Sequence, residues 1–232
     1  MPRVGLEHPG SGSGRRLLGV VSRPAVDVVL PFKGSDADLA RVADRLAAIA
    51  IGPQDTLTIA DNRPGAVDSS QGPVRIVGAG ERQTSYHARN VAAVAGQAPW
   101  LVFVDADVLP PPDLLDRYFA TAPAPTTGVL AGAVVDDEPA TDTAASRYAY
   151  LKSSMSQEIT LADDAWPFAQ TANAAVRREA FAQVGGFEAS IRSGGDADLC
   201  FRLRAAGWGL ERRPEAAVVH RNRATVGRML AQ

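Results

Sequence analysis

The stretch PWLVFVDAD, residues 99–107, joins an apolar run to two aspartates, Asp105 and Asp107, that are separated by one alanine. A continuous apolar run is typical of a strand that is covered on both faces of its sheet. Prolines follow at 110–112, and proline is tolerated in the first turn of a helix because its missing N–H would have no partner there. The stretch therefore predicts a buried strand, a turn and a helix. Two explanations of the acids stay open: Asp107 caps the helix, or the pair binds a cation.

The alternation of strand and helix extends to the residues on either side of this stretch. Apolar runs predict three earlier strands, at 25–32, 55–62 and 73–80. Helices are predicted at 35–50, capped by Ser35 or Asp36, and at 111–122, and residues 82–97 are predicted to be a loop that opens into an alanine-rich helix. This alternation predicts an α/β fold with a mainly parallel sheet flanked by helices.

The second half of the chain is less regular. We expect a helix at 141–157, an irregular loop at 159–168, a strand and helix with a glycine stop at 169–187, a helix at 194–208 and a last strand at 216–223. Residues 1–24, rich in Gly, Ser and Arg, are expected to form a mobile leader, and 224–232 a tail. One domain, 25–223, lies between them, with 25–107 and 108–223 as its two halves.

Composition excludes several classes of function. The 232 residues are 46% hydrophobic and 22% charged with a net charge of -2, which gives no electrostatic basis for nucleic-acid binding. A single cysteine, Cys200, excludes an internal disulfide and a cysteine-based zinc cluster, and it favours a reducing compartment. No apolar run reaches the roughly 18–20 residues needed to span a bilayer. We expect a cytoplasmic protein whose basic run 212–223 contacts a membrane surface, a diphosphate or solvent.

Three acids follow the predicted strands directly. Ligands of open α/β sheets bind outside the carboxyl ends of the strands, which places Asp61, Asp105 and Asp107 on one rim. Residues i and i+2 of an extended segment point the same way, so that Asp105 and Asp107 address one ligand. Two carboxylates at that distance repel each other unless a cation or hydrogen-bond donors compensate. A hard divalent ion that also binds substrate phosphates fits this requirement.

Several motifs occur together with this rim. VDVVLPFKG, HARNVAAVAGQAPWLVFVDADVLPP, QTANAAVRREAFAQVGGF and GGDADLCFRLRAAGW follow one another in that order. The series resembles the GT-A-fold, family-2 nucleotide-sugar glycosyltransferases and covers about residues 25–223. The resemblance implies a Rossmann-like sheet whose first half binds the nucleotide and whose smaller, mixed second half binds the acceptor.

The resemblance also implies residues that bind a UDP- or GDP-linked sugar donor. Asp61 matches the residue that hydrogen-bonds the base, and Pro31 and Phe32 match the lining of the base pocket. Arg89 matches a residue that holds the donor near its base and phosphates. Asn173 resembles a position near the donor sugar, although a buried strand amide would have the same sequence pattern.

Metal and catalytic roles follow from the same resemblance. Asp107 would ligate Mn²⁺ or Mg²⁺ directly, and Asp105 would lie near the ribose or a metal-bound water. His220 matches a position that in some members supplies another metal ligand or contacts the diphosphate. Asp196 would be the general base that deprotonates the acceptor hydroxyl, with inversion at the anomeric carbon. The acceptor itself would be a saccharide, a lipid-linked compound or a small molecule.

One departure from the family pattern bears on the base. Family members often carry Glu-Asp where this chain has Gly195-Asp196. Asp198, two residues further on, is the alternative base if the alignment is shifted. Otherwise Asp198 would cap or fix the helix that carries Arg202.

Two other classes of function stay open. A strand that ends in Asp-x-Asp also resembles the first motif of haloacid-dehalogenase-type phosphatases, which use Mg²⁺ with an aspartate nucleophile. That motif normally opens the chain, whereas here two or more strand–helix units precede it. The second alternative is a non-catalytic relative that binds a nucleotide sugar without transferring it.

Overall fold

The computed structural model describes residues 23–137, 156–162 and 165–221, and the account below is confined to them. The expected leader up to residue 22, the expected helix 141–157 apart from its last two residues, and the expected tail 224–232 lie outside the described residues. No helix in the described ranges has the length and apolar character needed to cross a bilayer.

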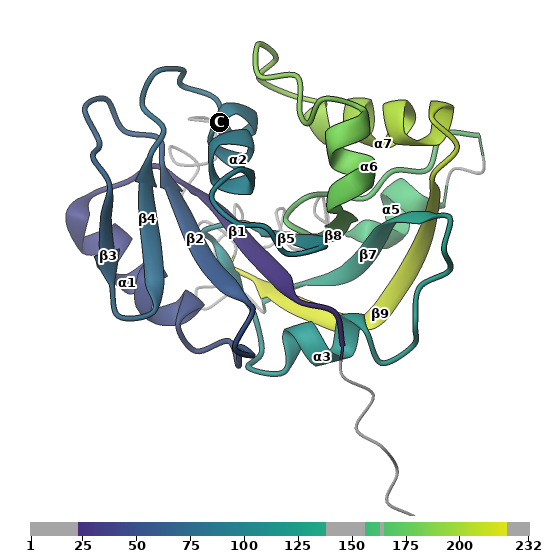
Figure 1. Ribbon diagram of the computed structural model, residues 1–232, viewed down its shortest axis with the longest axis horizontal. Coiled ribbons are helices and arrows are strands. Elements are labelled where there is room, and N and C mark those ends of the chain that lie inside the picture. The colour runs from purple at the N-terminus through teal and green to yellow at the C-terminus, as the bar shows by residue number, and fades with distance from the viewer. Residues whose placement is uncertain (1–22, 138–155, 163–164, 222–232) are drawn as a thin grey trace, which may run out of the picture.

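Among these residues, nine strands form one sheet in the order β3-β4-β2-β1-β5-β8-β7-β9-β6 (Figure 1). The strands are β1 (Val26–Phe32), β2 (Thr56–Asp61), β3 (Ser69–Gln71), β4 (Val74–Gly78), β5 (Trp100–Val104), β6 (Val108–Leu109), β7 (Thr127–Asp136), β8 (Asn173–Arg177) and β9 (Gly209–His220). The helices are α1 (Asp36–Leu46), α2 (Ser85–Ala93), α3 (Leu114–Tyr118), α5 (Gln157–Leu161), α6 (Arg178–Gln183) and α7 (Gly195–Ala205).

The sheet is mixed. β4, β2, β1 and β5 are parallel neighbours and form the parallel half-sheet that the strand–helix alternation predicts. β8 runs antiparallel to β5 and to β7, β7 is parallel to β9, and the edge strands β3 and β6 are antiparallel to their neighbours. The α/β class is therefore confirmed, and the parallel character is confined to about half of the strand pairs.

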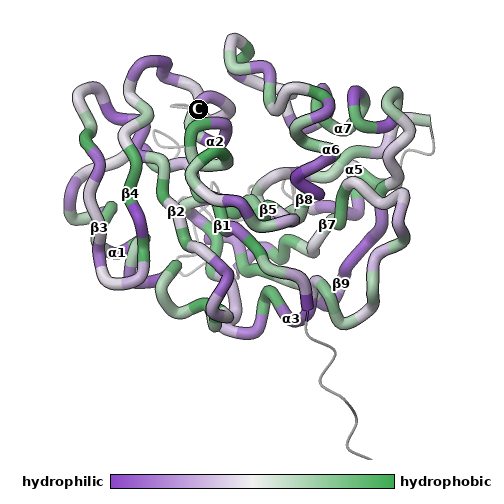
Figure 2. The backbone as a smooth tube through the Cα atoms, viewed as in Figure 1, coloured by the Kyte–Doolittle hydropathy of each residue, from purple (hydrophilic) through white to green (hydrophobic). Residues whose placement is uncertain are grey.

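Two apolar layers cover the two faces of the sheet. Val28 and Leu30 of β1 pack with α1 and α3 on one face, whereas Val29 packs with α2, α6 and α7 on the other. This alternation follows from the two-residue period of a strand, and a strand buried on both faces needs apolar side chains at every position. Figure 2 shows the resulting hydrophobic stretches along β1 and a more hydrophilic β9, whose side chains are largely exposed or half-buried.

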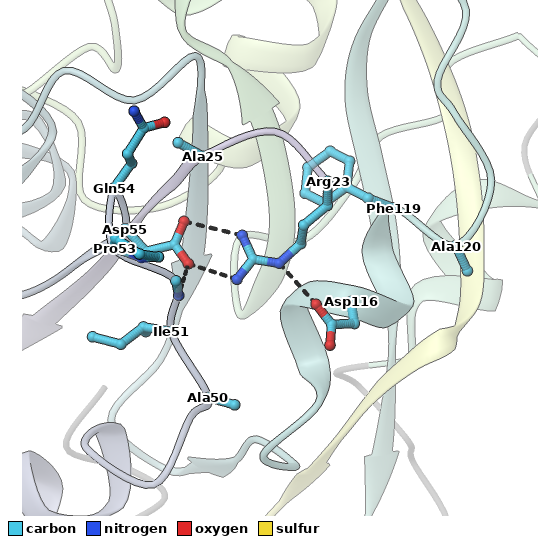
Figure 3. Close-up of a pocket in the computed structure, with 11 residues that line it drawn as sticks. Arg23, Ala25, Ala50, Ile51, Pro53, Gln54, Asp55, Asp116, Phe119 and Ala120 are labelled. Atoms are coloured by element: carbon cyan, nitrogen blue, oxygen red, sulfur yellow. Dashed lines mark hydrogen bonds and ion pairs between the residues drawn. The ribbon is translucent and has the colours of Figure 1, made fainter. Parts of the chain in front are cut away.

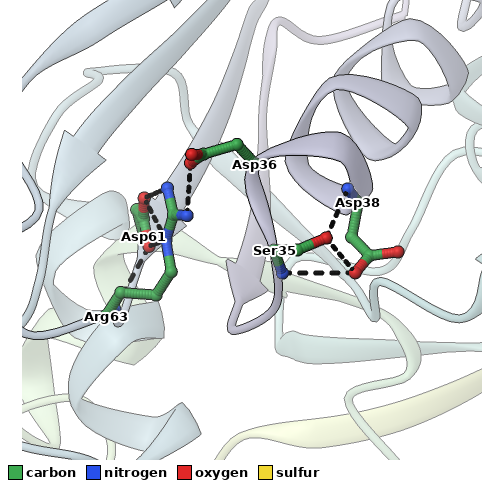
Figure 4. A network of polar contacts seen from close by, with 5 residues as sticks. All are labelled: Ser35, Asp36, Asp38, Asp61 and Arg63. Carbon is green, nitrogen blue, oxygen red and sulfur yellow. Dashed lines mark hydrogen bonds and ion pairs between the residues drawn. The ribbon is translucent and has the colours of Figure 1, made fainter.

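The helix after β1 begins where the sequence predicts. Ser35 caps α1: its hydroxyl accepts a hydrogen bond from the Asp38 backbone N–H, and the Asp38 carboxylate accepts one from the Ser35 backbone N–H (Figure 4). These reciprocal bonds satisfy donors that the first turn of a helix leaves without partners. They fix the direction in which the chain leaves β1 toward the rim of the sheet.

Several local expectations were wrong. The α3 helix is shorter than the expected 111–122, and α5 lies in part of the segment expected to be an irregular loop. β9 begins at Gly209 rather than near 216, because its first half is a polar segment that pairs with β7. The short polar strand β3 and the two-residue β6 were not predicted, since neither contains a recognisable apolar pattern.

Candidate active site

A cavity of about 570 Å³ opens at the carboxyl ends of β1 and β5. It is lined by residues after β1, on one side of α1, at the start of α2 and after β5. Five of the predicted site residues line it: Pro31, Phe32, Arg89, Asp105 and Asp107. The position agrees with the rule that ligands bind outside the carboxyl ends of the strands in open α/β sheets.

Arg89 and Asp105 form the buried ion pair of this cavity. Arg89, only 4% exposed, donates from Nη2 to Asp105 Oδ1 at 2.5 Å, and its guanidinium lies over the rings of Tyr86 and Phe187. Burial opposes the charge of Arg89, but Asp105 and Asp196 outweigh it and raise the pKa of the guanidinium. Burial raises the pKa of Asp105, with Asp107 and Asp196 adding to this effect and Arg89 opposing it.

One buried side-chain nitrogen or oxygen in the described part of the chain has no hydrogen-bond partner, and it is Nε of Arg89. A buried donor without a partner costs about 1–3 kcal/mol. An acceptor group of a bound molecule would remove that cost. Arg89 thus lies in the cavity wall with its charge balanced by Asp105 and with one buried donor that lacks a protein partner.

Asp107 and His220 meet on the same rim. β6 and β9 pair so that Val108 lies opposite His220, and the Arg221 backbone N–H donates to the carbonyl of Asp107 at 2.9 Å. His220 Nε2 lies 3.7 Å from Asp107 Oδ2, which is beyond hydrogen-bond distance. The other ring nitrogen, Nδ1, lies 2.8 Å from Asp136 Oδ1. Burial lowers the pKa of His220, but Asp107 and Asp136 raise it to about 9.

The side chains of Asp107 and His220 have the donor atoms that a divalent cation requires. Within the described residues, no three His, Cys, Asp or Glu side chains are grouped so that they could hold a metal ion by themselves. Mg²⁺, and Mn²⁺ at similar sites, is commonly held by one or two carboxylates together with waters and substrate phosphates, and imidazole suits transition metals. Asp107 and His220 therefore fit a cation whose other ligands come from a bound diphosphate and water.

Asp196 approaches the same group from α7. The Thr171 hydroxyl donates to Asp196 Oδ1 at 2.5 Å, and the charge of Asp196 acts on Arg89, Asp105 and Tyr86. Asp198 is used differently, because its carboxylate accepts two hydrogen bonds from Arg202. Of the two acids, Asp196 is the one whose charge affects the pKa values of Arg89 and Asp105.

Gly195, the departure from the family pattern, is fitted to Tyr86. A Cβ at residue 195 would lie 2.5–2.7 Å from ring atoms of Tyr86, a distance that real contacts do not show. The Gly195 backbone N–H donates to the Tyr86 hydroxyl at 2.9 Å, and the Tyr86 ring stacks on Phe187. The space that a longer side chain would need is thus filled by a buried tyrosine that also contacts Arg89.

Asp61 lies at the end of β2, next to Phe32 in the strand register, but it does not line the cavity. Arg63 holds its carboxylate through Nε and Nη2 and reaches Asp36 of α1 through Nη1 (Figure 4). The guanidinium also lies 5.8 Å from the centre of the Phe32 ring. Asp61 therefore supports the wall beside Phe32, and its expected contact with a base stays a prediction.

Asn173 is buried in the core and does not line the cavity. This residue is 0% exposed, and it lies in the core between β7, β9 and α3. Its Oδ1 accepts from the Tyr118 hydroxyl at 2.7 Å, and its Nδ2 donates to the carbonyls of Ala133 and Ala216. The amide oxygen and nitrogen are engaged by these core partners. This arrangement is that of a buried strand amide, and a contact with a donor sugar stays a prediction.

Sequence reasoning missed other polar side chains of the cavity, among them Arg41, Arg45 and Asn62. Arg45 donates to the carbonyl of Ala106, the residue between the two rim aspartates, at 2.8 Å. Arg41 and Arg45 are four residues apart and so share one face of α1. That spacing is the signal that would have identified them.

A second cavity, of about 740 Å³, lies beside the amino end of β1. Figure 3 shows Arg23 between the carboxylates of Asp55 and Asp116, which it contacts at 2.5–3.0 Å and 2.9 Å. Arg23 falls within the expected leader, yet here it is tied to the fold. None of the predicted site residues lines this cavity in the described chain.

The fold is that of the GT-A glycosyltransferases. A family model described as "Glycosyltransferase like family 2" matches residues 15–232, and the chain belongs to this family. Membership removes the phosphatase alternative.

Similar proteins agree with this assignment. The chain is 28% identical, over 93% of its length, to a pre-mycofactocin glycosyltransferase of Mycobacterium tuberculosis, and 31% identical, over 56%, to the glycosyltransferase AglE of Haloferax volcanii. It spans 45% and 42% of those proteins, less than half of each.

Solved structures show the same fold. A mannosyltransferase of Pyrobaculum calidifontis in complex with GDP-Man and Mn²⁺ superposes with a TM-score of 0.61 at 20% identity, covering 86% of this chain and 57% of that one. GalNAc-T7 with UDP, GalNAc and Mn²⁺ gives 0.58 at 13% identity, covering 86% of this chain and 44% of that one.

Proposed function

We propose that this protein transfers a sugar from a UDP- or GDP-linked donor to an acceptor hydroxyl, with inversion and with the help of Mn²⁺ or Mg²⁺. The observation that carries the proposal is the convergence of Arg89, Asp105, Asp107 and His220 at one rim, with Asp196 close enough to act on their charges. The solved relatives that hold GDP-Man or UDP together with Mn²⁺ support the same class of donor and cofactor.

In this proposal the first half of the chain binds the donor. Pro31 and Phe32 flank the base, and Arg89 helps to hold the donor near its base and phosphates from the cavity wall. Asp107 and His220 hold the cation together with the diphosphate. The cation neutralises negative charge on the departing nucleoside diphosphate.

Asp196 acts as the general base from the second half of the chain. The acceptor hydroxyl is a weak nucleophile until a carboxylate takes its proton in the transition state. Thr171 orients Asp196 by donating to Oδ1, which leaves Oδ2 to receive that proton. Attack from the side opposite the diphosphate inverts the anomeric carbon. The division at residue 107 into a donor half and an acceptor half is part of the same proposal.

Release of nucleoside diphosphate tests the proposal. Wild-type protein with Mn²⁺ is incubated with UDP- and GDP-sugars, with and without a panel of saccharide acceptors, beside the Asp196→Asn variant. We expect release from at least one donor, slow without acceptor and faster with one, and a loss of about 100-fold or more in the variant. Donor binding with no release under any condition would instead establish the non-catalytic alternative.

A further inference from the structure

The strand register aligns three residues in a row across β7, β9 and β6. Asp136 of β7 lies opposite His220 of β9, and His220 lies opposite Val108 of β6, the residue that follows Asp107. Paired residues on adjacent strands project from the same face of a sheet. The register therefore sets the imidazole beside Asp136, and Asp107, in the turn before β6, reaches the ring from the rim.

The side-chain contacts follow that alignment. The Asp136 carboxylate and the His220 ring are both buried, at 8% and 12% side-chain exposure, while Asp107 is 35% exposed. Nδ1 is within hydrogen-bond distance of Asp136 Oδ1, at 2.8 Å, and Nε2 faces Asp107 Oδ2 across 3.7 Å. The two nitrogens thus have different partners: one faces the protein interior and the other the rim.

We propose that Asp136 is a positioning residue for the cation site. An ionised carboxylate accepts hydrogen bonds and donates none, so that Nδ1 must carry the proton that Asp136 receives. A cation held by His220 and Asp107 would take the place of the Nε2 proton and accept the lone pair of that nitrogen, while Nδ1 keeps its proton. Asp136 in this way selects the tautomer and the orientation of His220. The inference rests on the proposed metal-dependent function.

The test measures the metal directly. Pulsed EPR of Mn²⁺ bound with GDP or UDP detects a coordinated imidazole through coupling to its ¹⁴N nucleus. We expect this coupling in the wild type and its loss in Asp136→Ala, with Mn²⁺ affinity weakened about 10- to 100-fold. Asp136→Asn should retain the coupling, because its amide oxygen still accepts the Nδ1 proton. Asp137→Asn, a change at the exposed neighbouring acid, should leave both coupling and affinity unchanged.

A second measurement needs no variant. ¹⁵N NMR of histidine-labelled wild-type protein with Mg²⁺ and GDP or UDP should show the proton of His220 on Nδ1. Any one of three results would overturn the inference and leave the proposed sugar transfer intact. The first is Mn²⁺ that binds with nucleotide but shows no nitrogen coupling. The others are unchanged coupling and affinity in Asp136→Ala, and a proton on Nε2. Absence of any Mn²⁺ binding in the presence of either nucleotide would overturn both.

Discussion

Arg202 holds the carboxylate of Asp198, one turn earlier in α7, through hydrogen bonds of 3.0 Å from Nε and 2.5 Å from Nη2 to Oδ2. The same guanidinium donates to the carbonyls of Val184 and Gly186, where α6 ends. Asp198 therefore orients the arginine that joins α7 to the end of α6. Asp196 accepts a hydrogen bond from the Thr171 hydroxyl instead, and its charge helps to raise the pKa of Asp105 at the rim.

This division predicts opposite effects for the two acids. Asp196→Asn should lower kcat by about 100-fold or more with a nearly unchanged Kd for the donor, because only the proton acceptor is lost. Asp198→Asn should keep most activity and cost about 0.3–1 kcal/mol of stability, as expected for an i,i+4 ion pair. Steady-state kinetics and urea unfolding of both variants check this. A large loss of kcat in Asp198→Asn alone would assign the base to Asp198.

The contact between Gly195 and Tyr86 predicts that Gly195→Ala lowers stability when Tyr86 is present and raises it when Tyr86 is replaced by alanine. Gly195→Ala should destabilise the protein by about 1–3 kcal/mol, because the new methyl group overlaps a buried ring. In a Tyr86→Ala background the same substitution should stabilise by about 0.4–1 kcal/mol, since alanine leaves the unfolded chain less conformational freedom than glycine does. A double-mutant cycle of unfolding free energies measures the difference. Equal effects in both backgrounds would contradict the contact.

Asn173 should matter for stability rather than for donor binding. Asn173→Ala removes the partners of the Tyr118 hydroxyl and of two backbone carbonyls. At about 1–3 kcal/mol for a buried group left unsatisfied, we expect a loss of at least about 2 kcal/mol. Donor affinity, measured by titration under conditions where the variant is folded, should stay within a few fold of the wild type. A selective loss of affinity with unchanged stability would return Asn173 to the donor site.

Cys200 should be an unreactive thiol. Burial raises its pKa to about 12 and Asp196 adds to this, so that the thiolate, which is the reactive form, is scarce at pH 8. Modification by a disulfide reagent should therefore be slow in native buffer and rapid in denaturant. Increasing the pH from 7 to 9 should accelerate modification of the protein by about 100-fold, because its thiolate fraction is still far from saturation, whereas a small exposed thiol control with a pKa near 8.5 should gain only roughly 25-fold. Fast stoichiometric labelling of the folded protein would show that the thiol is accessible.

The parts of the fold that were predictable have strong local signals. The apolar runs before Asp61 and Asp105 identify strands because a strand covered on both faces needs apolar residues at every position, and Ser35 with Asp38 identifies the start of α1. β3 and the first half of β9 are polar edge segments, whose place is set by pairing with β4 and β7. No local pattern reports such pairing.

The site shows the same limit. Sequence identified Asp107 and His220, but the Asp136 partner of His220 is 84 residues away from it and is found only through the strand register. Asn173 has the residue type of a ligand contact, and only its burial shows that its amide serves the core. Residue type can thus be read from the chain, whereas the direction of a side chain depends on packing.

Calorimetric titration of GDP and UDP into the protein tests the central claim, that Asp107 belongs to a site where a cation and a nucleoside diphosphate bind together. With Mn²⁺ in excess, we expect the wild type to bind at least one of the two nucleotides, and we expect binding to weaken by more than about 10-fold in EDTA and in Asp107→Asn. Equal affinity with Mn²⁺, with EDTA and in the variant would contradict the account.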